Sequence, residues 1–166
     1  MNMVAKVFDF DDVLVKTDSF VIVNNKGKTK KLTPGQYAIY NPKSGDQFDY
    51  GHFRGELKNP RSIIKYNKLL IMMHRRGNPI FILTARSDRN PIAKYLSDMG
   101  IKRNVTIIVL NSSDPQRKKE YIKKLINRGY NDIEFFDDSP KYISAVNTLK
   151  DEFPAVRITT RLVPRQ

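Results

Sequence analysis

The sequence contains no cysteine and only two histidines among its 166 residues. The lack of cysteine excludes disulfide bonds, zinc sites built from thiolates and cysteine nucleophiles, and it permits a reducing cytoplasm. Any metal ion would be held by oxygen ligands or by His52 and His74, and these two histidines lack the spacing of a metal site. We therefore expect both histidines to have non-catalytic roles.

Long apolar stretches are absent as well. No run approaches the roughly 20 residues that are needed to cross a bilayer. The N-terminus leads directly into a strand-like segment, so we expect no targeting signal. We therefore expect a soluble, cytoplasmic protein with no membrane partner. The length fits a single domain, and 40% hydrophobic residues are enough to build its core.

Acidic residues are few relative to basic ones. The chain has 17 Asp and Glu against 30 Lys and Arg, which gives a formal net charge of +13. Such a charge raises the local concentration of polyanions, so nucleotides, nucleic acid or acidic surfaces are candidate partners. The alternative is a solvated shell of lysines without a specific partner, because the basic residues are spread over several predicted helices.

Five apolar runs rich in β-branched and aromatic residues predict strands. They are Val4–Phe10, Pro79–Leu83, Val105–Leu110, Ile133–Phe136 and Val156–Thr160. Segments of helical period lie between them, and four pairs of a capping residue and a proline predict the helix starts: Asn59-Pro60, Asn90-Pro91, Asp114-Pro115 and Ser139-Pro140. Gly77, Gly100 and Gly129 follow as C-terminal caps. The alternation predicts an α/β protein with a three-layer α/β/α, Rossmann-like parallel sheet.

Residues 19–58 interrupt this rhythm, and we refer to them as the insert. Turn-forming stretches such as Asn24–Lys28 and Pro42–Asp46 separate short apolar runs at Phe20–Val23 and Tyr37–Tyr40. We expect a small hairpin-like cap on a core of about residues 1–18 and 59–166, within one domain. Its aromatic and basic residues would stack bases and pair with phosphates, or they would only pack a small apolar cluster that covers the sheet edge.

Polar residues follow three of the predicted strands. Asp9 and Asp11 close the first, Thr84 follows the second, and Asp137 and Asp138 follow the fourth. Because the carboxyl ends of parallel strands share one edge, these residues should meet there. Paired carboxylates supply the few oxygen ligands that Mg²⁺ accepts while it keeps waters and a phosphate. An Asp-x-Asp motif alone is weak evidence, since such acids often lie in turns, but the combination is far more specific.

The order of these motifs resembles the haloacid dehalogenase-like superfamily. The motifs concerned are Asp9-x-Asp11-x-Val13, Leu83-Thr84-Ala85-Arg86, a lysine in the segment after Asp114-Pro115, and Asp137-Asp138. The resemblance covers roughly residues 4–18 and 60–160. The chain is also similar to small proteins of this superfamily from tailed bacteriophages, which would place it in the host cytoplasm. An acid two residues after the nucleophile marks phosphatases and phosphotransferases in the superfamily.

The resemblance implies a role for each of these residues. Asp9 would attack phosphorus and form an aspartyl-phosphate, while Asp11 would act as general acid and then as general base. Thr84, Ala85 and Arg86 would bind phosphate together with Lys118, for which Lys119 is the alternative. Asp9, the main-chain carbonyl of Asp11, and Asp138 would hold Mg²⁺, with Asp137 holding a metal-bound water. Asp12 would have a local turn role.

The activity implied by the resemblance is that of a magnesium-dependent phosphatase. Together with the charge, it points to a phosphorylated small molecule such as a nucleotide, or to a phosphorylated nucleic-acid end. The alternative is a catalytically weak module of the same fold that binds a protein partner or, non-specifically through its basic surface, nucleic acid. Phosphoryl transfer to an acceptor other than water remains equally compatible with these motifs.

Overall fold

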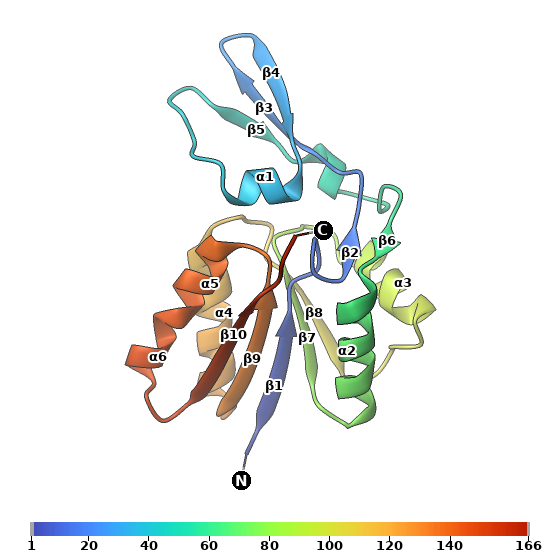
Figure 1. Cartoon of the computed structure of the whole chain (residues 1–166), viewed down its shortest axis with the longest axis vertical. Coiled ribbons are helices and arrows are strands. Elements are labelled where there is room, and N and C mark those ends of the chain that lie inside the picture. Colours follow the sequence, from blue (N-terminus) through green and yellow to red (C-terminus); the bar gives the residue numbers. More distant parts are fainter. Residues whose placement is uncertain (1, 166) are drawn as a thin grey trace.

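A five-stranded parallel sheet forms the centre of the computed structural model, which describes residues 2–165 (Figure 1). Its strand order is β10-β9-β1-β7-β8. The strands are β1 (Val4–Phe8), β7 (Ile80–Thr84), β8 (Val105–Val109), β9 (Asp132–Asp137) and β10 (Arg157–Leu162). Each predicted strand is present, with ends shifted by one or two residues. The prediction of a parallel α/β sheet flanked by helices is confirmed.

Helices cover both faces of this sheet. On one face lie α2 (Ile64–Arg75) and α3 (Asn90–Asp98), and on the other lie α4 (Pro115–Asn127), α5 (Pro140–Asn147) and α6 (Leu149–Glu152). Successive side chains of a strand point to opposite faces, so Phe8 joins the α2 and α3 cluster while Val7 joins the α4 and α5 cluster. Burial on both faces explains why the strands read as continuous apolar runs.

The predicted helix starts are confirmed in three of four places. Asp114 caps α4 by accepting the backbone N–H of Gln116 at 3.0 Å, and prolines occupy the first turns of α3 and α5. The predicted side-chain caps of α3 and α5 are wrong, because α3 begins at Asn90 itself and Ser139 makes no capping hydrogen bond. The start predicted at Asn59-Pro60 is wrong. The chain first forms β6 (Arg61–Ser62), because its return from the insert pairs with β2 (Val15–Lys16), and α2 begins only at Ile64. The three predicted glycine caps all have positive φ.

The insert folds as a separate three-stranded antiparallel sheet of order β4-β3-β5. Its strands are β3 (Val21–Asn25), β4 (Lys28–Leu32) and β5 (Gln47–Asp49). Lys26 and Gly27 link β3 to β4 with φ of 49° and 78°, the positive values that a two-residue hairpin turn of type I′ requires. A short 3₁₀ helix, η1, spans Gly51–Phe53.

One short run within the insert differs from its prediction. Tyr37–Tyr40 was expected to be strand-like, but the chain forms α1 (Pro34–Ala38) there instead. Thr33 starts this helix with a reciprocal capping box, in which its hydroxyl accepts the Gln36 N–H at 3.1 Å and its N–H donates to the Gln36 side chain at 2.9 Å. This local capping outweighs the aromatic composition of the segment.

A short stem joins the insert to the core. The antiparallel pair β2 and β6 forms this stem, and above it the Asp18 N–H donates to the Lys58 carbonyl at 2.8 Å. Asp18 also pairs with Arg61 at 3.0 Å. The stem holds the insert over the carboxyl ends of the parallel strands (Figure 1). Among the described residues, no helix is long and apolar enough to cross a membrane.

Candidate active site

A tight loop after β1 fixes the first pair of acids. The Asp9 N–H donates to the Phe136 carbonyl at 2.9 Å, which extends the β1 and β9 pairing to the carboxyl edge of the sheet. The Phe10 carbonyl then accepts the N–H groups of Leu14 at 3.0 Å and Val15 at 3.3 Å. Asp12 adopts the left-handed conformation with φ of 60°, which agrees with its predicted turn role.

Three buried carboxylates gather at this edge, and we call them the carboxylate cluster. Asp9, Asp137 and Asp138 each offer an oxygen that lies within 4.8 Å of the other two. Asp9 directly follows β1, and Asp137 and Asp138 lie at the end of β9. The order of the strands reverses between β1 and β9, and open α/β sheets bind ligands at such a position. Closely spaced carboxylates repel one another, so a divalent cation with hard oxygen ligands fits this donor set.

The electrostatics of the carboxylate cluster follow from burial and mutual repulsion. Burial and then the Asp9 charge raise the pKa of Asp137 to about 7, although Lys118 opposes this shift. Burial, Asp9 and Asp137 together raise the pKa of Asp138 to about 9. Burial, followed by the charges of Asp11 and Asp9, raises the pKa of Asp12 to about 6. The negative charge of the carboxylates at this edge of the sheet is therefore only partly compensated by nearby positive charge.

Lys118 supplies the buried positive charge behind the cluster. Its Nζ lies 2.7 Å from Asp137 Oδ2 and 3.0 Å from Asp9 Oδ1, and the ring centre of Tyr142 is 4.2 Å away. Burial opposes the charged form, but the two carboxylates outweigh it and the pKa of Lys118 is raised. Of the two lysines considered, Lys118 is the one placed at the carboxylates. A direct contact from it to phosphate stays a prediction.

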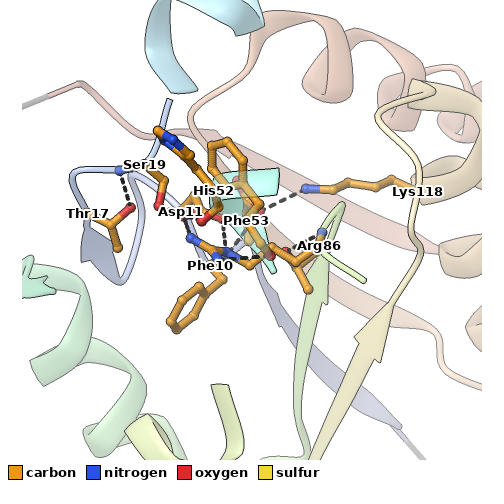
Figure 2. A network of polar contacts seen from close by, with 10 residues as sticks. Phe10, Asp11, Thr17, Ser19, His52, Phe53, Arg86 and Lys118 are labelled. Atoms are coloured by element: carbon orange, nitrogen blue, oxygen red, sulfur yellow. Dashed lines mark hydrogen bonds and ion pairs between the residues drawn. The ribbon is translucent and has the colours of Figure 1, made fainter. Parts of the chain in front are cut away.

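Arg86 lies against Asp11 rather than in open space. Its guanidinium donates from Nε to Asp11 Oδ2 at 2.8 Å and from NH2 to Asp11 Oδ1 at 2.9 Å, and NH1 donates to the Phe53 carbonyl at 3.3 Å (Figure 2). The Phe53 ring centre lies 4.9 Å from the guanidinium carbon. Arg86 is only 4% exposed, so its contacts are fixed by packing. It connects the predicted acid–base residue with the insert.

The segment after β7 forms one wall of the site. Thr84 is buried, and its Oγ1 accepts the Arg86 N–H at 3.1 Å while keeping its own proton for donation. The Ala85 carbonyl accepts the Ser112 N–H at 3.2 Å, which joins this wall to the loop after β8. The two histidines lie elsewhere: His52 Nδ1 accepts the Phe20 N–H at 3.1 Å, and His74 Nε2 bonds to the Arg103 carbonyl at 2.6 Å.

A pocket of about 340 Å³ lies between the sheet edge and the insert. Asp9, Asp11, Thr84 and Asp138 line its core side, together with Ala85 and Arg86. Sequence reasoning brought these residues to one edge but overlooked Ser113, from the loop after β8, and Tyr142, from α5, which also line the pocket. The same strand-end rule, applied to Val105–Leu110, would have found Ser113. Tyr142 had no comparable signal, because it lies in a helix.

The raised carboxyl pKa values predict how stability depends on pH. Asp137 and Asp138 have a pKa of about 7 and about 9 in the folded chain, against an ordinary value of 3.8. Between these values the unfolded chain releases protons that the folded chain keeps, so the free energy of unfolding falls as the pH rises. In a chelator, the thermal unfolding midpoint should therefore decrease from about pH 5 to 9.

Two controls separate this effect from general titration. The Asp138→Asn variant lacks the larger shift and should have a flatter curve in the chelator. Mg²⁺ should flatten the wild-type curve as well, because a bound cation stabilises the ionised carboxylates. A wild-type midpoint that rises over this range in the chelator would contradict the account.

No model of a protein family matches the chain, and a search of curated proteins finds no similar sequence.

Proposed function

We propose that this protein is a magnesium-dependent phosphohydrolase of the haloacid dehalogenase-like superfamily, acting on a nucleotide or on a phosphorylated nucleic-acid end. One observation carries the proposal: Asp9 and Asp138 of the carboxylate cluster, backed by a buried lysine, line the same pocket as Asp11 and Thr84. A structural ion-pair network would not need a second acid and a hydroxyl converging on the same cavity.

The donor set fits Mg²⁺, since it offers only hard oxygen ligands, two of which, Asp9 and Asp138, line one end of the pocket. Asp9 and Asp138 would hold the ion directly, with Asp137 holding one of its waters and the Asp11 carbonyl as the predicted further ligand. When bound, Mg²⁺ offsets the repulsion between an anionic nucleophile and an anionic phosphate. The side chain of Asp11 lies outside the carboxylate cluster, in its pair with Arg86.

The proposed reaction proceeds in two steps. The Asp9 carboxylate attacks phosphorus, the bond from phosphorus to the leaving oxygen breaks, and Asp11 donates a proton to that oxygen. Asp11 then takes a proton from water, which attacks the aspartyl-phosphate and releases phosphate with the Asp9 carboxylate restored. Throughout, Asp9 Oδ1 is held by the Phe10 N–H at 2.8 Å and by Lys118 at 3.0 Å, which fixes the orientation of the nucleophile.

Arg86 holds Asp11 between the core and the insert. Its bidentate ion pair engages both oxygens of the Asp11 carboxylate, so in the proposed reaction this pair opens before Asp11 carries the proton that it donates. The bond from Arg86 to the Phe53 carbonyl links the pair to the position of the insert. Binding of a substrate beneath the insert is thereby coupled to the placement of the acid–base residue. The hydroxyl of Thr84 is proposed to donate a hydrogen bond to the phosphate.

A magnesium titration tests the proposed function. Wild-type protein should hydrolyse a generic aryl phosphate only with Mg²⁺, and excess chelator should abolish the activity. Asp138→Asn should raise the Mg²⁺ concentration for half-maximal activity by at least about tenfold, since even indirect ligand partners affect metal affinity to that degree. Asp98→Asn, at the exposed end of α3, is the matched control and should behave as wild type.

Two results would count against the phosphatase. Hydrolysis that is unaffected by the chelator or by Asp138→Asn would exclude the carboxylate cluster as the metal site. A complete lack of turnover, together with salt-sensitive nucleic-acid binding that survives substitution of Asp9 and Asp138, would support the binding module instead, because counterion release depends on Lys and Arg.

A further inference from the structure

We infer that the insert side of the pocket binds the base of a single nucleotide, so that the proposed phosphatase acts on free nucleoside monophosphates rather than on nucleic-acid ends. The inference depends on the proposed function for the position of the phosphate. The pocket is continuous from Asp9 and Asp11 at the sheet edge to the aromatic residues of the insert. A substrate with its phosphate at Asp9 would therefore place its leaving group beneath the insert.

Aromatic rings from separate segments form the wall of this half of the pocket. They are Tyr37, Tyr40, Tyr50 and Phe53 from the insert, and Tyr142 from α5. Over the described residues, the insert contributes no carboxylate or amide side chain to the lining. A base presents a flat ring that stacks on aromatic side chains. The amide of Asn111 and the hydroxyl of Ser113, which could bind sugar hydroxyls, come from the core side of the pocket. The chemistry of the wall therefore favours a base over a sugar.

The aromatic residues of the insert contact one another and also border the pocket. Phe48 is the centre of their mutual packing: it contacts the rings of Tyr37, Tyr40 and Tyr50, but it does not line the pocket. Tyr50 stacks on Phe48 with an interplanar angle of 20° and remains 36% exposed. Tyr37 and Tyr40 pack against the apolar cluster of the insert, and together with Tyr50 they also border the cavity that Asp9 and Asp11 line.

Contacts between the insert and the core limit the size of the ligand. The Tyr37 hydroxyl bonds to Ser113 Oγ at 2.8 Å, and Lys141 Nζ donates to the Tyr40 carbonyl at 3.1 Å. With the bond from Arg86 to the Phe53 carbonyl, the insert is tied to three separate parts of the core. The pocket volume of about 340 Å³ lies at the small end of the range for small-molecule sites, which suits one nucleotide.

Positive charge at the same pocket suits an anionic ligand. Arg54 and Lys141 both line it, one from the insert and one from the start of α5. Both side chains are exposed, so they would attract the phosphate without the cost of a buried cation. The pocket has groups that bind an anion and groups that bind a flat ring. A nucleoside monophosphate has an anion at one end and a flat ring at the other.

Binding to a catalytically disabled protein tests the inference apart from turnover. Calorimetry on Asp9→Asn with Mg²⁺ would compare a series of nucleoside monophosphates, inorganic phosphate, glucose 6-phosphate, and oligonucleotides phosphorylated at the 3′ or 5′ end. An unphosphorylated oligonucleotide measures non-specific attraction to the basic surface. At least one nucleoside monophosphate should bind about tenfold more tightly than inorganic phosphate or glucose 6-phosphate, as expected for one stacked base. The phosphorylated ends should bind no better than the unphosphorylated strand.

Variants of the aromatic wall provide the second arm. Tyr50→Leu and Tyr40→Leu, each made in the Asp9→Asn protein, keep an apolar side chain and should weaken nucleotide binding about tenfold while leaving inorganic phosphate binding unchanged. Phe20→Leu is the matched control, because Phe20 belongs to the insert but does not line the pocket. Nucleotide affinity that is unchanged in both tyrosine variants, or phosphorylated ends that bind as tightly as mononucleotides, would overturn the inference.

The two proposals fail in different ways. Nucleotide binding that depends on Tyr40 and Tyr50, in a wild-type protein without hydrolytic activity, would refute the phosphatase and retain the base site. Magnesium-dependent hydrolysis without any preference for nucleotides would refute the base site and retain the phosphatase.

Discussion

Replacing Asp9 with asparagine is expected to lower kcat for an aryl phosphate by at least about 10⁴-fold, the scale on which enzymes lose activity when the nucleophile is removed. Asparagine keeps the size of the side chain and can still accept the Phe10 N–H, which lies 2.8 Å from Asp9 Oδ1. The folded structure should therefore survive. Initial rates at saturating substrate and Mg²⁺ measure the loss.

The control for this prediction is Asp12→Asn. Asp12 lies in the same loop and has a left-handed conformation that asparagine tolerates, but it is not part of the carboxylate cluster. Its substitution should change kcat far less than substitution of Asp9. Metal-dependent hydrolysis retained by Asp9→Asn, at a rate close to wild type, would make the nucleophile assignment wrong.

Replacing Lys118 with methionine is expected to destabilise the fold by about 3–5 kcal/mol, because removal of one partner of a buried ion pair leaves the other charge uncompensated. Lys118 is 1% exposed and pairs with both Asp137 and Asp9. For a domain of this size, such a loss corresponds to a decrease of about 10 °C in the unfolding midpoint. Calorimetric melts in a chelator measure it.

The neighbouring lysine offers a matched control for this stability effect. Lys119→Met should leave the midpoint nearly unchanged, since Lys119 makes no ion pair among those found in the described residues. Mg²⁺ should restore part of the stability that Lys118→Met loses, because the ion and the lysine neutralise the same carboxylates. Equal midpoints for both variants in the chelator would show that Lys118 is not needed to neutralise the carboxylate cluster.

Much of the site follows from the sequence because strand ends in a parallel sheet share one edge. The apolar runs located the strands, so Asp9 and Asp137 were placed together across more than a hundred residues of chain. Lys118 was chosen for its position in the first turn after Asp114-Pro115, and the structure places it at the carboxylates. The placement of the acids depends on local periodicity and on a general rule of topology, whereas the choice of Lys118 depends on the resemblance to the superfamily.

Other features depend on contacts that no local pattern encodes. Arg86 was expected to bind phosphate, but its pairing with Asp11 depends on how β1 and β7 lie side by side. No helix starts at Asn59-Pro60, because the residues that follow pair as a strand with Val15 and Lys16, more than 40 residues earlier in the chain. The aromatic wall likewise combines the insert with Tyr142. Tertiary pairing therefore decides these positions.

The most direct test of the central claim is to locate the phosphoryl group on the protein during turnover. Wild-type protein would be mixed with Mg²⁺ and substrate, quenched in acid, and treated with borohydride, which reduces an aspartyl-phosphate to homoserine. Peptide mass spectrometry would then identify the modified residue. We predict homoserine at position 9 alone, dependent on both substrate and Mg²⁺. Modification of Asp11 or Asp138, or turnover with no modified aspartate, would contradict the account.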